Sequence, residues 1–373
     1  MLIGVPKEIK NNEFRVGLLP SSVKEFTTAG HDVLVQTNAG ASIHATDEEY
    51  IKAGATIAKD AKEVFAKADM IIKVKEPQPE ECKMLRKGQV LFTYLHLAAD
   101  RKQAEGLIDS GCTAIAYETV TGPFGGLPLL APMSEVAGRM SVQVGAVAMQ
   151  IGNRGGSGLL IGGVPGVKPA DVVIIGGGVA GTNAAKMAVG LDANVVILER
   201  SLDRIRQLED LFGPTANIIY STKASVDHYV FNSDLIIGAV LIPGAIAPKL
   251  ITKDMLKHMR PGAVIVDIAI DQGGCTETSK PTTHQDPTYM VDGILHYCVA
   301  NMPGAVARTS SQALNNAVLP YALQIANKGW RAALSENPHL MDGLTVHEGK
   351  ITQAEVAQDL GYEFFAPDQQ LAA

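Results

Sequence analysis

The chain has 373 residues, of which 46% are hydrophobic and 19% are charged, and its formal net charge at pH 7 is −7. This length is large for one hydrophobic core and suits two domains, and the composition is that of a globular rather than a disordered protein. The acidic balance and the lack of a basic run argue against a nucleic-acid-binding protein.

The sequence also argues against secretion, membrane insertion and metal binding. No charged segment followed by an apolar core opens the chain, so we expect no signal peptide. The uncharged run 309–327 contains eight Ser, Thr, Asn or Gln residues and Pro320, which makes it too polar for a bilayer. The four cysteines form no CxxC pair and no metal-ligand spacing with histidine. We therefore expect reduced thiols, no metal-binding residues that the sequence identifies, and a cytoplasmic protein.

The first 130 residues contain an alternation of strands and helices. Short apolar runs rich in β-branched residues are typical of parallel strands that are buried on both faces. The predicted strands are "LIGV", "HDVLVQT", "DMIIKVKEP", "QVLFTYLHL" and "CTAIAYE". Helices are predicted at "VKEFTTAG" and "DAKEVFAKA", and a longer helix over residues 134–151 with Ser134 as its N-cap.

The stretch "VVIIGGGVAGTNAAKMAVGLDANVVILER", residues 172–200, has the strand–turn–helix–strand order of a dinucleotide-binding unit. Gly176, Gly178 and Gly181 form a G-x-G-x-x-G pattern, which permits a tight turn and a close approach of the backbone to a pyrophosphate. Glu199 ends the second strand, where an acidic residue binds the ribose 2′-hydroxyl and repels a 2′-phosphate. The pattern predicts NAD rather than NADP as cofactor.

Further strands and helices complete this second series. Strands are predicted at "SDLIIGAV", "GAVIVDIAID" and "LHYCVA", and helices at "DRIRQLEDLF", "APKLITKDMLKHM" and, with a bend at Pro320, over residues 309–327. We therefore predict an α/β protein with two doubly wound domains. A Rossmann NAD-binding domain, residues 134–306, is inserted into a substrate domain made of residues 1–133 and 307–373. Two long helices are expected to join the domains and to create a cleft between them.

Candidate catalytic residues follow the carboxyl ends of predicted strands, where open parallel sheets bind their ligands. In the first domain these are Arg15, Lys75 and His96, and in the second they are Asp271 and Asn301. Each residue alone also has a structural explanation, as a solvated cation, a loop histidine or the cap of a turn. Their common place at strand ends favours a substrate site.

Other polar groups carry no such pattern. The carboxylate pairs Glu48–Glu49 and Glu80–Glu81 are typical of solvated helix faces, and Asp267 is expected to cap a helix or turn ahead of Gly273–Gly274. The sequence contains no G-x-S-x-G or H-E-x-x-H motif, so serine hydrolysis and zinc proteolysis have no support.

Several blocks resemble L-alanine dehydrogenases, from the first residues to about residue 365. They are "IGVPKEIKNNEFRVGLLP", "VKEPQPEE", "YLHLAAD", "GGGVAGTNAAKMA", "DIAIDQGGC" and "CVANMPGAVARTSS". Related families are the nucleotide-binding subunit of proton-translocating transhydrogenase and, more distantly, saccharopine dehydrogenase. The resemblance implies a cytoplasmic homo-oligomer, commonly a hexamer, that converts L-alanine, NAD⁺ and water to pyruvate, ammonium and NADH. No membrane and no nucleic-acid partner is implied.

The resemblance also implies residue roles. Arg15 and Lys75 would bind the substrate, His96 would be the general acid/base, Asp271 would be the second catalytic group and Asn301 would help to place substrate and nicotinamide. Glu199 stands where the family often has Asp, and Lys280 where Arg is common. The residues implied or predicted to contact the cofactor are Ser134, Gly176, Gly178, Val179, Gly181, Glu199, Arg204, Ser221, Val240, Leu241, Ile268, Ala269, Ile270, Lys280, Val299, Ala300 and Met302.

Two other functions remain open from the sequence. One is a transhydrogenase-like NAD(H)-binding subunit, which needs an NADP-binding partner and a membrane component. The other is a non-catalytic NAD-binding regulatory module, which binds the nucleotide without reducing it. The presence of Lys75, His96 and Asp271 together favours an amino-acid site over the first of these.

Overall fold

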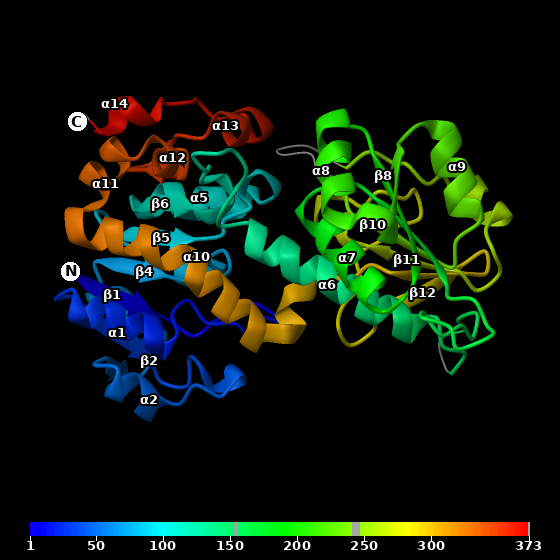
Figure 1. Cartoon of the computed structure of the whole chain (residues 1–373). Coiled ribbons are helices and arrows are strands. Elements are labelled where there is room, and N and C mark those ends of the chain that lie inside the picture. The colour runs from blue at the N-terminus through cyan, green and yellow to red at the C-terminus, as the bar shows by residue number, and fades with distance from the viewer. Residues whose placement is uncertain (153–154, 241–246, 372–373) are drawn as a thin grey trace. The chain divides into compact units, whose positions relative to one another are not determined.

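The computed structural model describes residues 1–152, 155–240 and 247–371. Leu241, one of the predicted cofactor contacts, lies outside these ranges. The chain divides into two compact units, and Figure 1 shows that each of them contains both strands and helices. Unit 1 comprises Met1–Met133 and Val306–Ala373, and unit 2 comprises Ser134–Ala305.

Unit 1 is built on an eight-stranded sheet in the order β15-β14-β6-β5-β4-β1-β2-β3. Its strands are β1 (Leu2–Val5), β2 (Asp32–Gln36), β3 (Thr56–Ala58), β4 (Met70–Ile72), β5 (Val90–Thr93), β6 (Thr113–Ala116), β14 (Leu344–His347) and β15 (Lys350–Ile351). The neighbouring strands β6, β5, β4, β1, β2 and β3 are parallel to one another, and β14 pairs antiparallel with β6. Because β1 pairs with both β2 and β4, the winding of the chain reverses there. Ligands of doubly wound sheets bind at such a reversal.

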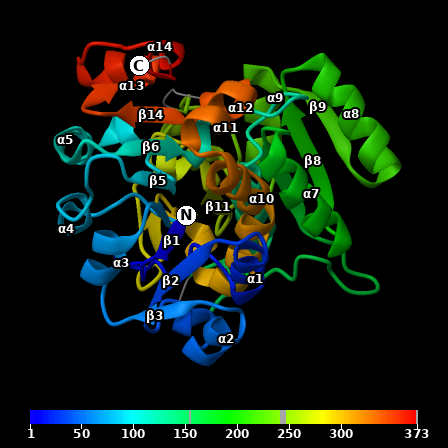
Figure 2. The same cartoon turned by 90° about the vertical axis from the view of Figure 1, so that its left-hand side faces the viewer.

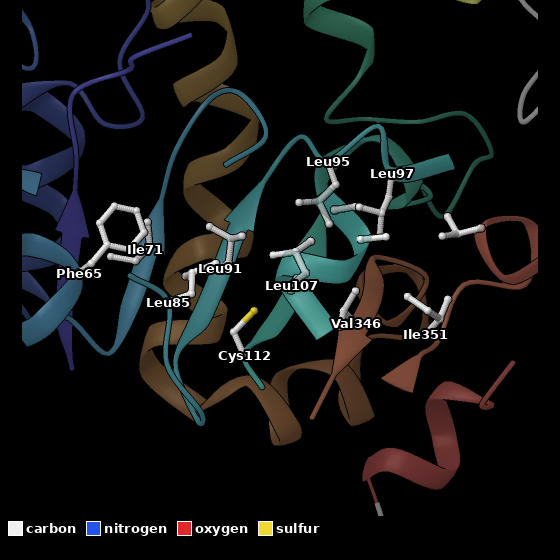
Figure 3. Close-up of a cluster of buried hydrophobic side chains, with 14 of the residues drawn as sticks. Phe65, Ile71, Leu85, Leu91, Leu95, Leu97, Leu107, Cys112, Val346 and Ile351 are labelled. Carbon is white, nitrogen blue, oxygen red and sulfur yellow. The ribbon is translucent and has the colours of Figure 1, made fainter. Parts of the chain in front are cut away.

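Helices cover the sheet of unit 1 and bury its apolar side chains. They are α1 (Pro20–Thr28), α2 (Asp47–Lys52), α3 (Ala61–Lys67), α4 (Pro79–Cys82), α5 (Arg101–Ser110), α10 (Ala307–Lys328), α11 (Trp330–Glu336), α12 (Pro338–Met341), α13 (Ala354–Leu360) and α14 (Pro367–Leu371). Figure 3 shows one core cluster, in which Phe65 of α3 and Leu107 of α5 pack near Ile71, Leu91 and Val346 of the strands. This burial on both faces explains why the strands lack polar alternation.

Unit 2 is built on a seven-stranded sheet in the order β12-β13-β11-β10-β7-β8-β9. Its strands are β7 (Asp171–Ile175), β8 (Asn194–Glu199), β9 (Asn217–Tyr220), β10 (Leu235–Gly238), β11 (Val264–Asp267), β12 (Thr288–Val291) and β13 (Ile294–Tyr297). Its helices are α7 (Val179–Gly190), α8 (Leu202–Phe212), α9 (Lys223–Phe231) and all but the first turn of α6 (Ala131–Ala148). Six strands are parallel, β12 is an antiparallel edge strand, and the winding reverses between β7 and β10. Figure 2 shows α7 and α8 beside β8 and β9.

Two predicted helices differ from the observed ones at their ends. The helix expected over residues 134–151 is α6, which begins at Ala131, so Ser134 lies inside the helix and is not its N-cap. The amide of Ala131 already bonds the Leu127 carbonyl at 2.9 Å, which starts the helix earlier. The helix expected over 309–327 is α10, which continues through Pro320. All of α10 belongs to unit 1, whereas α6 has residues in both units.

The helix predicted at 247–259 is wrong over most of its length. Only a 3-10 helix, η5 (Asp254–His258), forms there. The Leu250 amide instead donates to the Cys275 carbonyl at 2.8 Å, and Ile251 forms an isolated parallel bridge with Thr276. Pairing with this second segment holds the chain extended. No helix within the described ranges is both long and apolar enough to cross a membrane.

Candidate active site

Two predicted substrate-binding residues and one predicted catalytic residue lie at one edge of the unit 1 sheet. Arg15 is in the loop between β1 and α1, Lys75 follows β4, and His96 follows β5. These strands are adjacent and parallel, so their carboxyl ends meet at the same edge, on the reversal between β1 and β4. The structure therefore brings a guanidinium, an ammonium and an imidazole to the part of the sheet where a ligand is expected.

Arg15 is buried and paired with Glu13. Its side chain is 2% exposed, and Nε and Nη2 donate to the two Glu13 carboxylate oxygens at 2.7 and 2.6 Å. Nη1 donates to the Met133 sulfur at 2.9 Å. Burial alone would lower the pKa of Arg15, but the hydrogen bonds and charge of Glu13 outweigh it and raise the pKa. The guanidinium is thus permanently charged and held in one orientation, as recognition of a carboxylate requires.

His96 is exposed and held in a strained conformation. Its φ is +48°, in the left-handed region that costs a residue other than glycine on the order of 1–3 kcal/mol. The His96 amide donates to Glu118 Oε1 at 2.5 Å, and its ring stacks on Tyr94 with centroids 5.7 Å apart. Burial raises the pKa of Tyr94, whose hydroxyl donates to the Leu129 carbonyl at 2.5 Å. Such a fixed, solvent-facing imidazole suits proton transfer.

A buried charge cluster lies next to Lys75 in the chain, and the sequence did not predict it. Lys73 is fully buried, and its Nζ lies 3.1 Å from Glu8 Oε2 and 2.7 Å from Glu81 Oε1. The prediction that Glu80–Glu81 is a solvated face is wrong for Glu81, which is 1% exposed. The signal was a lysine inside the apolar run "MIIKV", because a cation in a strand buried on both faces needs a carboxylate partner.

In unit 2, the glycine pattern forms the turn from β7 into α7. Gly176 has a φ of +101°, and a Cβ there would lie 2.8 Å from the Ala239 carbonyl oxygen. A Cβ on Gly181 would lie 1.8 Å from the Gly176 carbonyl oxygen. Gly178 is the N-cap of α7, and Val179 is its first residue, with a 43% exposed side chain. The backbone thus leaves room for a phosphate group at the helix N-terminus, where amide N–H groups and the helix dipole favour an anion.

Glu199 and Arg204 brace this glycine turn. Glu199 Oε2 accepts a hydrogen bond from the Gly177 amide at 2.8 Å, and Oε1 accepts from the Arg200 and Ser201 amides at 2.7 and 2.9 Å. Arg204 Nε donates to the Gly177 carbonyl at 2.8 Å. Both predicted cofactor residues therefore have a local structural role as well. That Glu199 also contacts a ribose stays a prediction.

Most of the other predicted cofactor residues follow strands of unit 2. Ser221 follows β9, and Val240 follows β10. The 3-10 helix η6 (Ile268–Gln272), which comes after β11, contains Ile268, Ala269 and Ile270. Val299 and Ala300 follow β13, and Met302 begins the 3-10 helix η7 (Met302–Val306). Parallel pairing places these strand ends at one edge of the sheet, with the glycine turn. Ser134 lies in α6, and the ammonium of Lys280 lies 4.4 Å from the ring centroid of Tyr289.

Asp267 anchors the loop that carries Asp271. It is fully buried and is the N-cap of η6, where its Oδ1 accepts from the Ala269 amide at 3.1 Å. Its Oδ2 accepts from the Cys275 amide at 2.8 Å and from Ser279 Oγ at 2.5 Å. The expectation that Asp267 caps a helix or turn is confirmed. Asp271 itself lies on η6 and is exposed.

The predicted site residues are divided between the units. Arg15, Lys75 and His96 belong to unit 1, and Asp271 and Asn301 belong to unit 2. That the two sets meet in one cleft stays a prediction. Asn301 has a φ of +62°, and its carbonyl accepts a hydrogen bond from the Gly304 amide at 2.9 Å. Across the described residues, no group of three or more His, Cys, Asp or Glu side chains could hold a metal ion.

Comparisons with known proteins agree over nearly the whole chain. Residues 4–137 match the model of the alanine dehydrogenase/PNT N-terminal domain, and residues 141–354 match that of the C-terminal domain. The chain is 57% identical to an alanine dehydrogenase of Halomonas elongata over 98% of both chains. It is 52% identical to an alanine dehydrogenase of Mycobacterium tuberculosis strain H37Rv over the full length of both.

Solved structures agree with these sequence matches. An L-alanine dehydrogenase superposes with a TM-score of 0.93 at 52% identity, covering 97% of this chain and 99% of the other. A transhydrogenase from Sinorhizobium meliloti superposes with a TM-score of 0.80 at 25% identity, covering 95% and 99%. The predicted α/β architecture with two doubly wound domains is confirmed. On these matches, the chain belongs to the alanine dehydrogenase/PNT family.

Proposed function

We propose that the protein is an NAD-dependent L-alanine dehydrogenase. In the forward reaction, L-alanine, NAD⁺ and water give pyruvate, ammonium, NADH and a proton. The identity of 57% to a curated alanine dehydrogenase over 98% of both chains carries the proposal most directly. The edge of the unit 1 sheet that carries Arg15 and Lys75 supports the proposal, because a 2-amino or 2-oxo acid has a carboxylate that these cations can bind.

The residues of unit 2 fit a dinucleotide. A Cβ at Gly176 or Gly181 would collide with backbone, so these positions need glycine, and the turn they form exposes the N-terminus of α7. Backbone amides there would hold the pyrophosphate, and Glu199 would accept from the ribose hydroxyls and repel the 2′-phosphate of NADP. When bound, the nicotinamide accepts the hydride. The family resemblance assigns further contacts to the cofactor residues predicted above.

We assign the chemistry on the substrate to residues of both units. Arg15 binds the carboxylate through its charged guanidinium, which Glu13 holds in place, and Lys75 binds the oxygen or nitrogen on C2. His96 transfers a proton at the carbinolamine oxygen when water adds to the imine. Asp271 transfers the proton of the attacking water or of the departing amine. Asn301 helps to place the substrate. Closure of the domains around the substrate would exclude bulk water and align the reacting atoms.

A turnover assay tests the proposal. NADH formation is measured at mildly alkaline pH with L-alanine, glycine, L-serine, L-lysine and L-glutamate, each with NAD⁺ and with NADP⁺. We expect strong activity with L-alanine and NAD⁺, and weak activity with glycine, which is one methylene smaller, because one methylene discriminates by only about 1–3 kcal/mol. NADH binding without any amino-acid turnover would refute the proposal and favour the transhydrogenase-like or regulatory alternative.

The resemblance also leads us to propose a homo-oligomer, a hexamer as in the family, that works in the cytoplasm. Sedimentation analysis would test the oligomeric state, for which a hexamer of the 39.4 kDa chain is expected. A monomer at micromolar concentration would contradict it.

A further inference from the structure

We propose that Lys73, Glu8 and Glu81 form a positioning cluster that fixes Arg15 and Lys75 relative to each other in the substrate site. The inference rests on the proposed function, because it assigns these three residues to recognition of the 2-oxo or 2-amino acid. None of the three is placed in contact with the substrate.

The cluster is a buried group of two carboxyl side chains around one ammonium. Lys73 has no exposed surface, and the Glu8 and Glu81 side chains that flank its Nζ are 2% and 1% exposed. Burial would lower the pKa of Lys73, but the two carboxylates outweigh it and raise the pKa. Burial raises the pKa of Glu8 in spite of Lys73. Buried ion pairs often stabilise a fold no better than apolar side chains of the same size, so stability alone is a weak reason for this one.

The cluster holds together the two segments that carry the substrate-binding cations. Glu8 lies in the loop that leads from β1 to Arg15, and Lys73 lies between β4 and Lys75. Besides its ion pair with Lys73, Glu8 accepts a hydrogen bond through Oε1 from the Val74 amide at 2.7 Å. One carboxylate thus binds both residues that directly precede Lys75.

Neighbouring contacts support the same junction. Lys10, from the Arg15 loop, pairs with Glu76, which follows Lys75. A Cβ at Gly17 would lie 2.4 Å from the Ile72 carbonyl oxygen, so the backbones of the two segments approach closely just after Arg15. The two segments are therefore in contact both before and after Arg15 in the chain.

Hydrogen bonds to the backbone carbonyls of Val74 and Lys75 then fix the position of Lys75 itself. Its carbonyl accepts from Thr93 Oγ1 at 2.9 Å, and the Val74 carbonyl accepts from the Tyr94 amide at 3.3 Å. Glu81 secures the other side of the cluster, because its Oε2 accepts from the Gln78 amide at 2.9 Å at the start of α4. Lys73 thus connects the loop of Arg15, the end of β4 and the start of α4 through one ammonium group.

The test compares substrate affinity with cofactor affinity in variants of the cluster. We expect KM for pyruvate and for L-alanine to rise at least tenfold in Lys73→Met. The same rise is expected in the triple variant Lys73→Met/Glu8→Gln/Glu81→Gln, which leaves no carboxylate of the cluster unpaired. The Kd for NADH should stay within twofold of wild type, because the cofactor residues belong to unit 2. Pyruvate titration of the NADH-bound protein by calorimetry gives the affinity without relying on turnover.

Gln89→Leu is the matched control. Gln89 is also fully buried in unit 1, but it precedes β5 at the opposite edge of the sheet, where its Nε2 donates to the Phe65 and Ala68 carbonyls at 2.8 Å. It should lower Tm and leave KM unchanged. If the Lys73 variants do not fold, Glu8→Gln, which keeps the side-chain volume, is expected to raise KM about threefold or more.

The outcomes separate the inference from the proposed function. A folded cluster variant whose KM and pyruvate affinity stay within twofold of wild type overturns the inference, as does a Gln89→Leu variant whose KM rises equally. Wild-type protein that binds NADH but neither oxidises L-alanine nor binds pyruvate overturns the proposed function instead.

Discussion

Replacement of Asp267 by Asn tests whether this buried carboxylate holds the loop of unit 2 that carries Asp271. The carboxylate accepts three hydrogen bonds, two at Oδ2 from the Cys275 amide and Ser279 Oγ and one at Oδ1 from the Ala269 amide. An amide of the same size has one acceptor oxygen. If that oxygen keeps the first two bonds, the NH₂ group faces the Ala269 N–H, and a buried donor loses its acceptor.

The expected cost follows from these contacts. Hydrogen bonds to a charged group contribute about 1.5–3 kcal/mol, and an unsatisfied buried donor costs about 1–3 kcal/mol, so a loss of roughly 2–4 kcal/mol of unfolding free energy is expected. Unit 2 spans Ser134–Ala305. For a domain of that size this corresponds to a Tm lower by roughly 5–15 °C. Displacement of Asp271, which η6 carries, should lower kcat at least about tenfold.

Differential scanning calorimetry and steady-state kinetics measure the two effects. Ser279→Ala is the graded control, since it removes one donor to Asp267 and leaves the carboxylate in place; we expect less than half the Tm shift. An Asp267→Asn variant with a Tm within 2 °C of wild type and an unchanged kcat would refute the anchoring role.

Three further predictions follow from the site and from buried titratable groups. His96→Ala should lower kcat about 10²–10⁴-fold and leave the Kd for NADH unchanged in a fluorescence titration, and near wild-type turnover would exclude it as the acid/base. Burial lowers the pKa of His296 below its ordinary 6.5. As the pH drops below about 6.5, His296 therefore binds a proton in the unfolded chain more readily than in the folded protein, and the stability of the fold decreases. His296→Gln should therefore flatten the decline of Tm between pH 7 and 5, and an equal slope would contradict this. Burial raises the pKa of Cys112 to about 11 and that of Cys82 to about 12, and all four cysteines are free and buried. The native protein should therefore react with less than one equivalent of a thiol reagent at pH 8, and the unfolded protein should react with four.

The elements that the sequence predicted well are those with a strong local pattern. The β-branched run before Gly176 and the strand ending at Glu199 predicted β7 and β8, because burial on both faces requires an unbroken apolar run. Elements with weak patterns were missed. Among them are β3 (Thr56–Ala58), which is only three residues long, and β9 (Asn217–Tyr220), which has no fully buried residue.

The wrong predictions came from contacts between distant segments. Residues 247–253 have apolar residues at helical spacing, but their pairing with residues 275–276 cannot be deduced from a local pattern. Glu81 has the appearance of a surface residue until Lys73, eight positions earlier, is placed beside it in the core. Likewise the positions of Arg15, Lys75 and His96 at strand ends were predictable, whereas the pairing of Arg15 with Glu13 required the structure.

The most direct test of the account is to follow the hydrogen on C2 of L-alanine. The protein is incubated with L-[2-²H]alanine and NAD⁺, and the reduced nucleotide is analysed by mass spectrometry. Transfer of the C2 hydrogen as a hydride predicts one deuterium in the NADH for each pyruvate formed, with no exchange into water. Reduced nucleotide without deuterium, or no pyruvate in the presence of bound NAD⁺, would contradict the assignment as an L-alanine dehydrogenase.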